Sequence, residues 1–188
     1  MKRAVFGLIA IGVVAGVIAF KGSASGQTEG EAAPIYGVKM PAGYRDWTLI
    51  SVARVGTPFN DLRAKLGNDV ATRAFREGTV PFPDGTIIAR LAWNQVASED
   101  NNNAFRAILR QRFSPDVLQK LLSESFVAGQ ATNVQFMVKD STKYASTGGW
   151  GFAQFTDGKP DGEAVHKGCF LCHALAKDRD LVFTHYSH

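Results

Sequence analysis

Two thiols and an imidazole lie within five residues near the end of the sequence, in the run Cys169-Phe-Leu-Cys172-His173. These cysteines are the only two in the chain. A C-x-x-C-H run is typical of c-type haem attachment, in which each thiol forms a thioether with one porphyrin vinyl group. The adjacent imidazole is then placed to ligate the iron from the proximal side. The run predicts one covalent haem c, bound through Cys169 and Cys172, with His173 as the iron ligand.

Other readings of the same pair of cysteines carry less weight. A thioredoxin-like redox pair lies near the start of a β-α-β unit, and no such unit follows this motif. A zinc site needs two further ligands, which two of His166, His173, His185 and His188 would supply, so zinc stays open as an alternative. A disulfide across two residues would close too short a loop to add much stability.

The first 25 residues have the layout of a leader. Met1-Lys2-Arg3 is basic, residues 4–20 are apolar, and small residues follow from Gly22 to Gly26. This layout is that of a secretory signal peptide, so we expect residues 1–25 to be cleaved or, alternatively, kept as a membrane anchor. Either outcome places the rest of the chain outside the cytoplasm. A bacterial periplasm, where haem c is attached, fits best.

Composition restricts the partners of what remains. Residues 26–36 are polar and small and read as a flexible lead-in, and residues 37–188 suffice for one domain with a hydrophobic core. The leader holds three basic residues and no acidic one, so its removal lowers the formal charge from +4 to about +1. No basic block with interleaved aromatic residues remains, and we expect no nucleic-acid partner.

The middle of the chain shows mixed patterns in which strands are prominent. Runs rich in β-branched and apolar residues predict strands over residues 46–55, 86–96, 131–138 and 150–155, and a closing strand over 181–186. Turns are expected at Asp84-Gly85 and Asp157-Gly158, where glycine is free to take positive φ. The pattern therefore predicts an α+β fold rather than an all-helical cytochrome.

Three helical regions are expected. Residues 60–75 have helical spacing, because Leu62, Leu66, Val70 and Phe75 would share a face. Residues 104–123 are expected to break at Ser114-Pro115, since proline suits the first helical position, and a loop is expected over 101–103. A third helix, over 162–177, would carry the haem motif.

Several short runs, taken in order, resemble the cytochrome P-460 family, which includes the cytochromes c-prime-beta. The resemblance spans roughly Pro41 to Tyr186. It rests on Tyr44-Arg-Asp-Trp47, Phe82-Pro-Asp-Gly-Thr86, Val138-Lys-Asp-Ser141, Gly149-Trp-Gly-Phe152, the C-x-x-C-H run, and Asp180-Leu-Val-Phe-Thr184.

The resemblance implies an antiparallel β-sheet flanked by helices, a five-coordinate iron with His173 proximal, and a homodimer. It also implies chemistry with small nitrogen species, because members of one type oxidise hydroxylamine and members of the other bind nitric oxide. The hydroxylamine-oxidising members bond a lysine to the porphyrin edge. The corresponding stretch here, residues 72–78, has no lysine, and Lys65 is the nearest one.

Candidates for the distal side of the haem follow from this comparison. Phe75 and Phe82 flank the segment that covers the haem in relatives and are the aromatic candidates. Arg45, Arg73 and Glu77 are the charged ones, as partners of the haem propionates, contacts to a bound ligand, or a distal base. Each of these charged side chains also fits an ordinary solvated surface position.

Three functions remain open on the sequence. The first, which the missing lysine favours, is a periplasmic haem protein that binds or detoxifies nitric oxide. The second is a hydroxylamine-oxidising enzyme that passes electrons to a soluble cytochrome c. The third is a six-coordinate electron carrier, for which Met137 would supply the sixth ligand, although Met137 fits a core position better.

Overall fold

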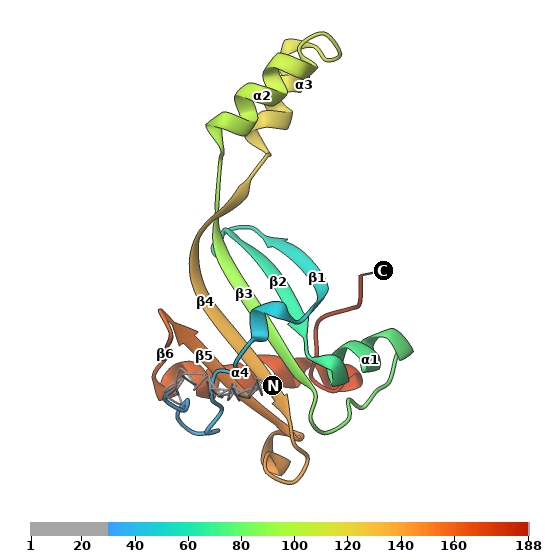
Figure 1. Ribbon diagram of the computed structural model, residues 1–188, viewed down its shortest axis with the longest axis vertical. Coiled ribbons are helices and arrows are strands. Elements are labelled where there is room, and N and C mark those ends of the chain that lie inside the picture. Colours follow the sequence, from blue (N-terminus) through green and yellow to red (C-terminus); the bar gives the residue numbers. More distant parts are fainter. Residues whose placement is uncertain (1–29, 188) are drawn as a thin grey trace, which may run out of the picture.

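A six-stranded antiparallel sheet organises the chain (Figure 1). The computed structural model describes residues 30–187, so the predicted leader and the first residues of the lead-in lie outside the described part. Each strand pairs with the next one along the chain, which makes the sheet a meander. The strands are β1 (Thr48–Val55), β2 (Asp61–Gly67), β3 (Ile87–Val96), β4 (Val127–Lys139), β5 (Trp150–Thr156) and β6 (Lys159–Pro160).

The side chains of β2 to β5 alternate between two faces, as the strand period requires. One row of paired residues runs Leu66, Ala89, Phe136, Ala153. The neighbouring row, which points to the opposite face, runs Lys65, Arg90, Gln135, Gln154. The sheet therefore has one apolar face and one face that carries a polar row.

The apolar face is covered by the segment that precedes β1. Its core cluster includes Ala33, Val38 and Tyr44 from that segment, packed with Leu91 and Phe136 of the sheet. The Tyr44 and Phe136 rings meet edge to face with centroids 5.1 Å apart. This arrangement of aromatic rings is a favourable one in protein cores, and we call this side the closed face.

Two helices flank the opposite face. Helix α1 (Asp69–Glu77) begins where the Asn68 side chain accepts a hydrogen bond from Ala71 N at 2.9 Å, and it ends at Gly78 in the left-handed conformation. Helix α4 (Glu163–His173) lies against β5. Ala71 of α1 and Phe170 of α4 contact one apolar cluster, which contains Trp150 and Phe152 of β5.

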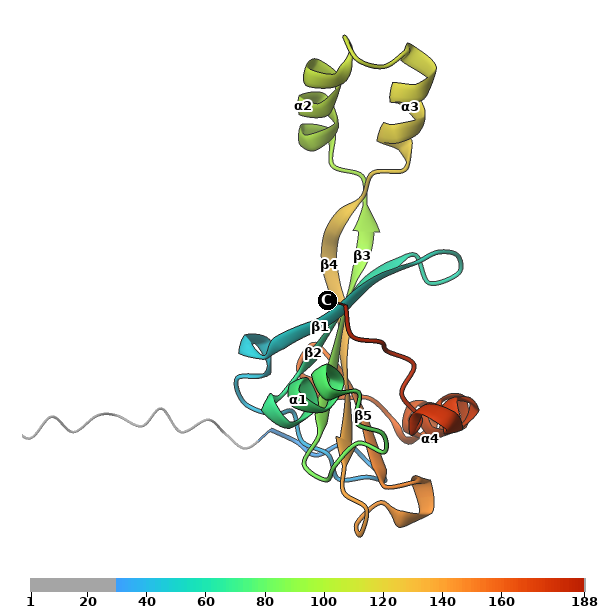
Figure 2. The same cartoon turned by 90° about the vertical axis from the view of Figure 1, so that its right-hand side faces the viewer.

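A helical arm projects from the sheet (Figures 1 and 2). Strands β3 and β4 extend as a two-stranded ribbon, and its tip carries α2 (Glu99–Leu109) and α3 (Pro115–Ser123). Helix α2 has no buried residue, and α3 buries only Leu118 and Leu122. Of the helices in residues 30–187, none has the length and apolarity needed to cross a membrane.

The α+β prediction is confirmed, with some local corrections. Residues 60–75 are not one helix, because residues 61–67 form β2 and only the second half is helical. Residues 181–186 form no strand, and residues 101–103 lie inside α2 rather than in a loop. The predicted turns are correct, since Gly85, Asp157 and Gly158 all have positive φ.

Candidate haem site

Helix α4 presents His166, Cys169 and His173 at intervals of three and four residues, so all three lie along one side of the helix. His166 is fully buried. Its Nε2 accepts a hydrogen bond from Gln154 N at 3.0 Å, and its Nδ1 lies 3.0 Å from Gly162 O. His166 therefore fixes α4 on β5 and is not a surface group. Residues 30–187 contain no group of three His, Cys, Asp or Glu side chains arranged to hold a metal ion.

His173, the last residue of α4, has one ring nitrogen committed to the backbone. Nδ1 lies 2.7 Å from the carbonyl oxygen of Leu181, so it carries the proton and donates it. Nε2 is then the atom with a free lone pair, the usual state of a metal-binding histidine. Burial lowers the pKa of His173, the hydrogen bond to Leu181 O opposes it, and the nearby Arg90 lowers the pKa further, so the net shift favours the neutral ring.

The carbonyl that His173 binds is held by a buried ion pair. Asp180 and Leu181 both have positive φ, and they turn the chain back towards α4. The Asp180 carboxylate accepts hydrogen bonds from Lys139 Nζ at 2.7 and 2.8 Å and from Phe82 N at 2.8 Å. Lys139 had no assigned role from the sequence, and here it fixes the turn that orients His173.

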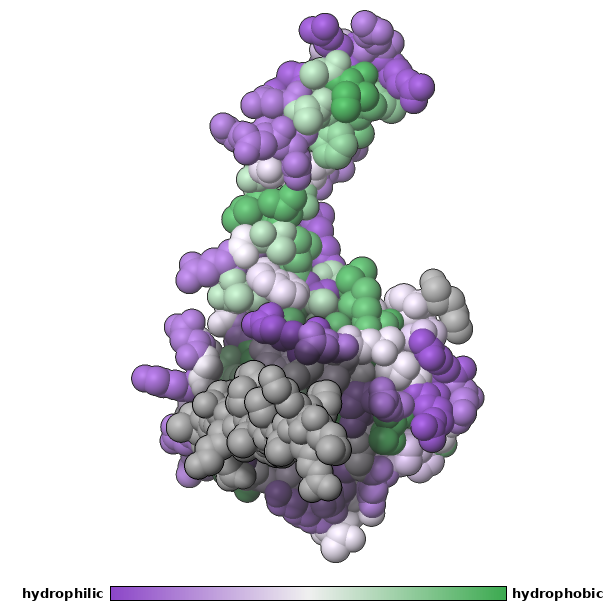
Figure 3. Space-filling model, in the orientation of Figure 1, coloured by the Kyte–Doolittle hydropathy of each residue, from purple (hydrophilic) through white to green (hydrophobic). Residues whose placement is uncertain are grey.

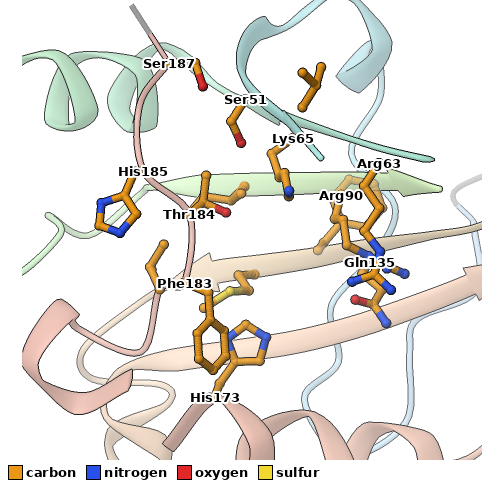
Figure 4. Close-up of a pocket in the computed structure, with 15 residues that line it drawn as sticks. Ser51, Arg63, Lys65, Arg90, Gln135, His173, Phe183, Thr184, His185 and Ser187 are labelled. Carbon is orange, nitrogen blue, oxygen red and sulfur yellow. The ribbon is translucent and has the colours of Figure 1, made fainter. Parts of the chain in front are cut away.

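His173 lies at one wall of a cavity of about 560 Å³ (Figure 4). The floor comes from β2, β3 and β4, and the opposite wall comes from the chain that follows α4. The Phe152 and Phe183 rings each lie with centroids 5.2 Å from the imidazole. The cavity is lined by Ser51, Val52, Arg63, Lys65, Ile88, Arg90, Gln135, Phe136, Met137, His173, Val182, Phe183, Thr184, His185 and Ser187.

The charged residues of this lining are all basic. Arg63, Lys65 and Arg90 line the cavity, and no aspartate or glutamate does. Burial lowers the pKa of Arg90 to about 10, with a further contribution from Arg63, so the guanidinium stays charged at neutral pH. Burial followed by the charges of Arg63 and Arg90 also lowers the pKa of Lys65. In contrast to the expectation from the sequence, a lysine does share the cavity with His173.

A comparison with family models identifies the family of the chain. The model described as Cytochrome P460 matches residues 41–184, most of the chain. The chain belongs to the cytochrome P460 family. Membership implies a haem-binding cytochrome. A search of the curated proteins finds no match.

The residues of this cytochrome P460 family member fit a haem. Cys172 is exposed, Cys169 is partly exposed, and neither forms a disulfide. Each thiol is therefore available for a thioether bond. His173 offers Nε2 to the iron, and the cavity beside it is within the size range of sites for small molecules and cofactors. These three residues would hold the group, and the group supplies an iron centre able to bind small ligands.

The aromatic residues predicted for the distal side do not line the cavity beside His173 in this P460 fold. Phe75 and Phe82 line a separate hollow of about 230 Å³, which shares Val182, Thr184 and His185 with the haem cavity and so lies across that segment. Their rings meet edge to face with centroids 4.9 Å apart.

The charged distal candidates are also outside the cavity. The guanidinium of Arg45 lies 5.3 Å from the centroid of the Tyr44 ring, on the closed face. Arg73 and Glu77 are exposed on α1, and neither lines the cavity with His173.

The helix predicted over residues 60–75 conceals the cationic residues of the floor, because residues 61–67 form β2. In the run Leu62-Arg-Ala-Lys-Leu66, apolar and basic residues alternate, which is a strand signal. Read as a strand, this run places Arg63 and Lys65 together on one face. Pairing then brings Lys65 opposite Arg90 of β3.

Proposed function

We propose that this protein is an exported mono-haem cytochrome that binds or turns over small nitrogen species, with nitric oxide as the favoured ligand. One haem c is attached through Cys169 and Cys172, and His173 is the proximal ligand. The iron keeps its sixth position open for the ligand.

The observation that carries this proposal is the fixed orientation of His173. Its Nδ1 is bound to Leu181 O, and the ring is held between Phe152 and Phe183 beside a large cavity. A neutral imidazole with a free Nε2 is what an axial ligand requires. The alternative sixth ligand, Met137, also lines this cavity, but it is 8% exposed and packs in the apolar cluster with Trp150 and Phe152.

Absorption spectra of the purified, haem-loaded protein test this proposal. We expect a high-spin ferrous spectrum with an ordinary c-type Soret band, which shifts when nitric oxide is added. A low-spin spectrum that ignores nitric oxide would contradict the proposal and indicate a six-coordinate electron carrier. The matched variant Met137→Leu removes the thioether with little change in volume. It leaves the spectrum unchanged if Met137 is only a core residue.

A second candidate function is hydroxylamine oxidation, with electrons passed to a soluble cytochrome c. Lys65 favours it, because the resemblance associates this activity with a lysine bonded to the porphyrin and Lys65 lines the cavity. The lowered pKa of Lys65 increases the share of neutral, nucleophilic amine.

Peptide mass spectrometry separates the two candidates. After digestion, a cross-linked haem peptide containing Cys169 and Cys172 carries the additional mass of a peptide that includes Lys65. A red-shifted ferrous Soret band accompanies that bond. We expect neither change under the favoured proposal. The haem peptide of Lys65→Arg then has the same mass as the haem peptide of the wild type. Finding both changes would move the assignment to the hydroxylamine enzyme.

We also propose that two copies of the chain pair through their arms. No residue of helix α2 is buried, and its neighbour in the arm is α3. A helix of this length is marginal in water without further tertiary contacts. Phe105, Ile108 and Val117 of the arm are 44%, 68% and 51% exposed. Figure 3 shows hydrophobic surface on the arm and on the ribbon that carries it.

Charge along α2 supports a second copy as the occupant of this surface. Its first turn holds Glu99 and Asp100, and Arg106 lies in its last turn, followed by Arg110 and Arg112. Antiparallel pairing of two α2 helices brings the acidic end of one beside the basic end of the other. A two-fold axis produces that arrangement twice, as in most homodimers.

Light scattering during size exclusion tests this pairing. We expect a dimer for the wild type, a monomer for Ile108→Asp, and a dimer for the control Leu175→Asp. Leu175 is 85% exposed and lies in the turn after α4, away from the arm. A monomeric wild type, or a dimer that survives Ile108→Asp, would show that the arms do not pair.

The location proposed for the protein is the periplasm. The leader-like composition of residues 1–25 supports export, and the haem motif supports a compartment where haem c is attached. The intact mass of protein from a periplasmic extract distinguishes cleavage near residue 25 from an anchored chain, which would instead fractionate with membranes. Recovery only from the cytoplasm would rule out export.

A further inference from the structure

The polar half of the cavity has an excess of partly buried positive charge. Arg63, Lys65 and Arg90 line it, and the lining contains no carboxylate. Asp61 is bound to Arg63, with Oδ1 at 2.9 Å from Nε, so it neutralises one cation from outside the lining. One carboxylate outside the lining therefore faces three cations, which leaves an excess of two positive charges on the floor.

Arg90 has an incomplete set of hydrogen-bond partners. Its side chain donates one hydrogen bond to Asn133 Oδ1, but its Nε is buried and has no partner among residues 30–187. A buried donor on a charged group is costly to leave unsatisfied. Lys65 lies opposite Arg90 on the next strand, so both cations face the same space.

Neutral hydrogen-bonding groups complete the polar half. Gln135 follows Arg90 in the same row across the sheet, and Ser51 and Thr184 line the cavity from β1 and from the chain after α4. A planar guanidinium, an ammonium and uncharged donors form a set suited to the oxygens of a carboxylate or a small oxyanion.

We propose that Arg63, Lys65 and Arg90 form an anion subsite in the cavity beside His173, for a carboxylate or a small nitrogen oxyanion. This inference rests on the proposed function, because it takes the haem to lie in this cavity. The required chemistry has two sources: the propionate groups of the haem itself, or a free oxyanion such as nitrite. In the first case the subsite seats the cofactor, and in the second it attracts an anionic ligand or product.

Nitrite titration of the ferric, haem-loaded protein tests the second source. If nitrite uses the subsite, Arg90→Gln and Lys65→Gln each weaken its binding about tenfold or more, because hydrogen bonds to charged groups are worth at least that factor. Arg90→Lys keeps the charge and retains most of the affinity. The control Arg73→Gln removes the same charge from an exposed position on α1 and has no effect.

The haem midpoint potential tests the first source. If Arg90 pairs with a propionate, Arg90→Gln raises the pKa of that propionate. The potential then varies with pH over about pH 5 to 8, where a paired carboxylate stays ionised. His173, His185, Lys65 and the nearby Asp61 are the other titratable groups around the floor. The wild type, Arg90→Gln and Arg73→Gln all contain these groups. The test therefore compares the pH dependence of the midpoint potential among the three proteins.

These outcomes separate the subsite from the proposed function. The far-UV circular dichroism spectrum shows whether each variant is folded, and only the affinity of the wild type for nitric oxide tests the proposed function. Unchanged nitrite affinity together with an unchanged potential in both Arg90→Gln and Lys65→Gln would overturn the subsite. Failure of the wild type to bind nitric oxide would overturn the proposed function, while the nitrite and potential measurements still decide the subsite. Lys65 is only half-buried, so Lys65→Gln remains informative if Arg90→Gln does not fold.

Discussion

Leu66, Ala89 and Phe136 form one row across β2, β3 and β4, and Lys65, Arg90 and Gln135 form the next row on the opposite face. The first row is packed under the segment before β1, in one apolar cluster with Tyr44. The second row borders a cavity of about 560 Å³. Neighbouring residues of the same strands point to opposite faces. These strands therefore provide a hydrophobic core on one face and a polar floor on the other.

The difference shows how stability and binding are divided in this fold. Apolar area removed from water stabilises the chain by itself, and the closed face provides that stabilisation. Cations on a partly buried floor lower the stability of the fold unless an anion binds beside them. The opposite face, which borders the cavity and which we call the open face, is therefore stabilised mainly by its rim. At this rim α4, the turn at Asp180 and the apolar cluster around Trp150 meet.

The largest effect on stability is expected from the closed face. Phe136 is 1% exposed, so Phe136→Ala removes a fully buried ring and lowers the free energy of unfolding by about 4 kcal/mol. Phe183 on the open face is 48% exposed, and Phe183→Ala costs much less. Urea unfolding of both variants measures the difference. Equal losses would show that the two faces contribute alike and would remove the basis of the comparison.

A somewhat smaller effect is expected at the rim of the open face. Lys139→Met leaves the buried Asp180 carboxylate without its cation, and such a loss costs about 3 kcal/mol. The exposed Lys177→Met is the matched control, with little expected change. Because Asp180 holds the turn that presents Leu181 O to His173, Lys139→Met also alters the axial-ligand spectrum of the haem. An unchanged spectrum in a destabilised variant would show that the ion pair between Lys139 and Asp180 stabilises the fold but does not orient His173.

The contrast between the faces also shows which features were predictable from the sequence. Strands β1, β3, β4 and β5 and the helix break at Pro115 follow from local composition, and all are confirmed. Strand β2 was not predicted, because Leu62, Leu66 and Val70 recur every four residues. Residues at this spacing share one face in a helix and also in a strand, so the spacing does not distinguish the two. The apolar face was predictable wherever the period was read correctly.

The cavity floor and its rim depend on pairing across long distances in sequence. Lys139 and Asp180 are 41 residues apart, and Arg90 reaches Asn133 across 43 residues. No local pattern connects such residues, because register and the left-handed turn at Asp180 decide their contact. The haem motif was found because all three of its groups lie within one short run, which is the case in which spacing alone determines chemistry.

The smallest effect concerns the cost of the cationic floor itself, measured without haem in a Cys169→Ser/Cys172→Ser background. Burial and the two guanidiniums lower the pKa of Lys65 in the folded state below its unfolded value. The folded protein therefore binds the proton less well than the unfolded chain. The penalty is fully present below the folded pKa and fades as pH rises towards about 10.4.

Lys65→Met is therefore expected to raise stability at pH 7. The gain stays below about 1 kcal/mol, because solvent screens a half-exposed amine. It shrinks as the pH approaches the unfolded pKa, where the wild-type lysine is neutral in both states. Urea unfolding of the two proteins at neutral and alkaline pH measures the trend. In the haem-loaded protein the gain at pH 7 disappears if a propionate neutralises Lys65. A gain that persists with haem bound would mean that no carboxylate of the haem reaches the floor, leaving the free oxyanion as the partner of these cations.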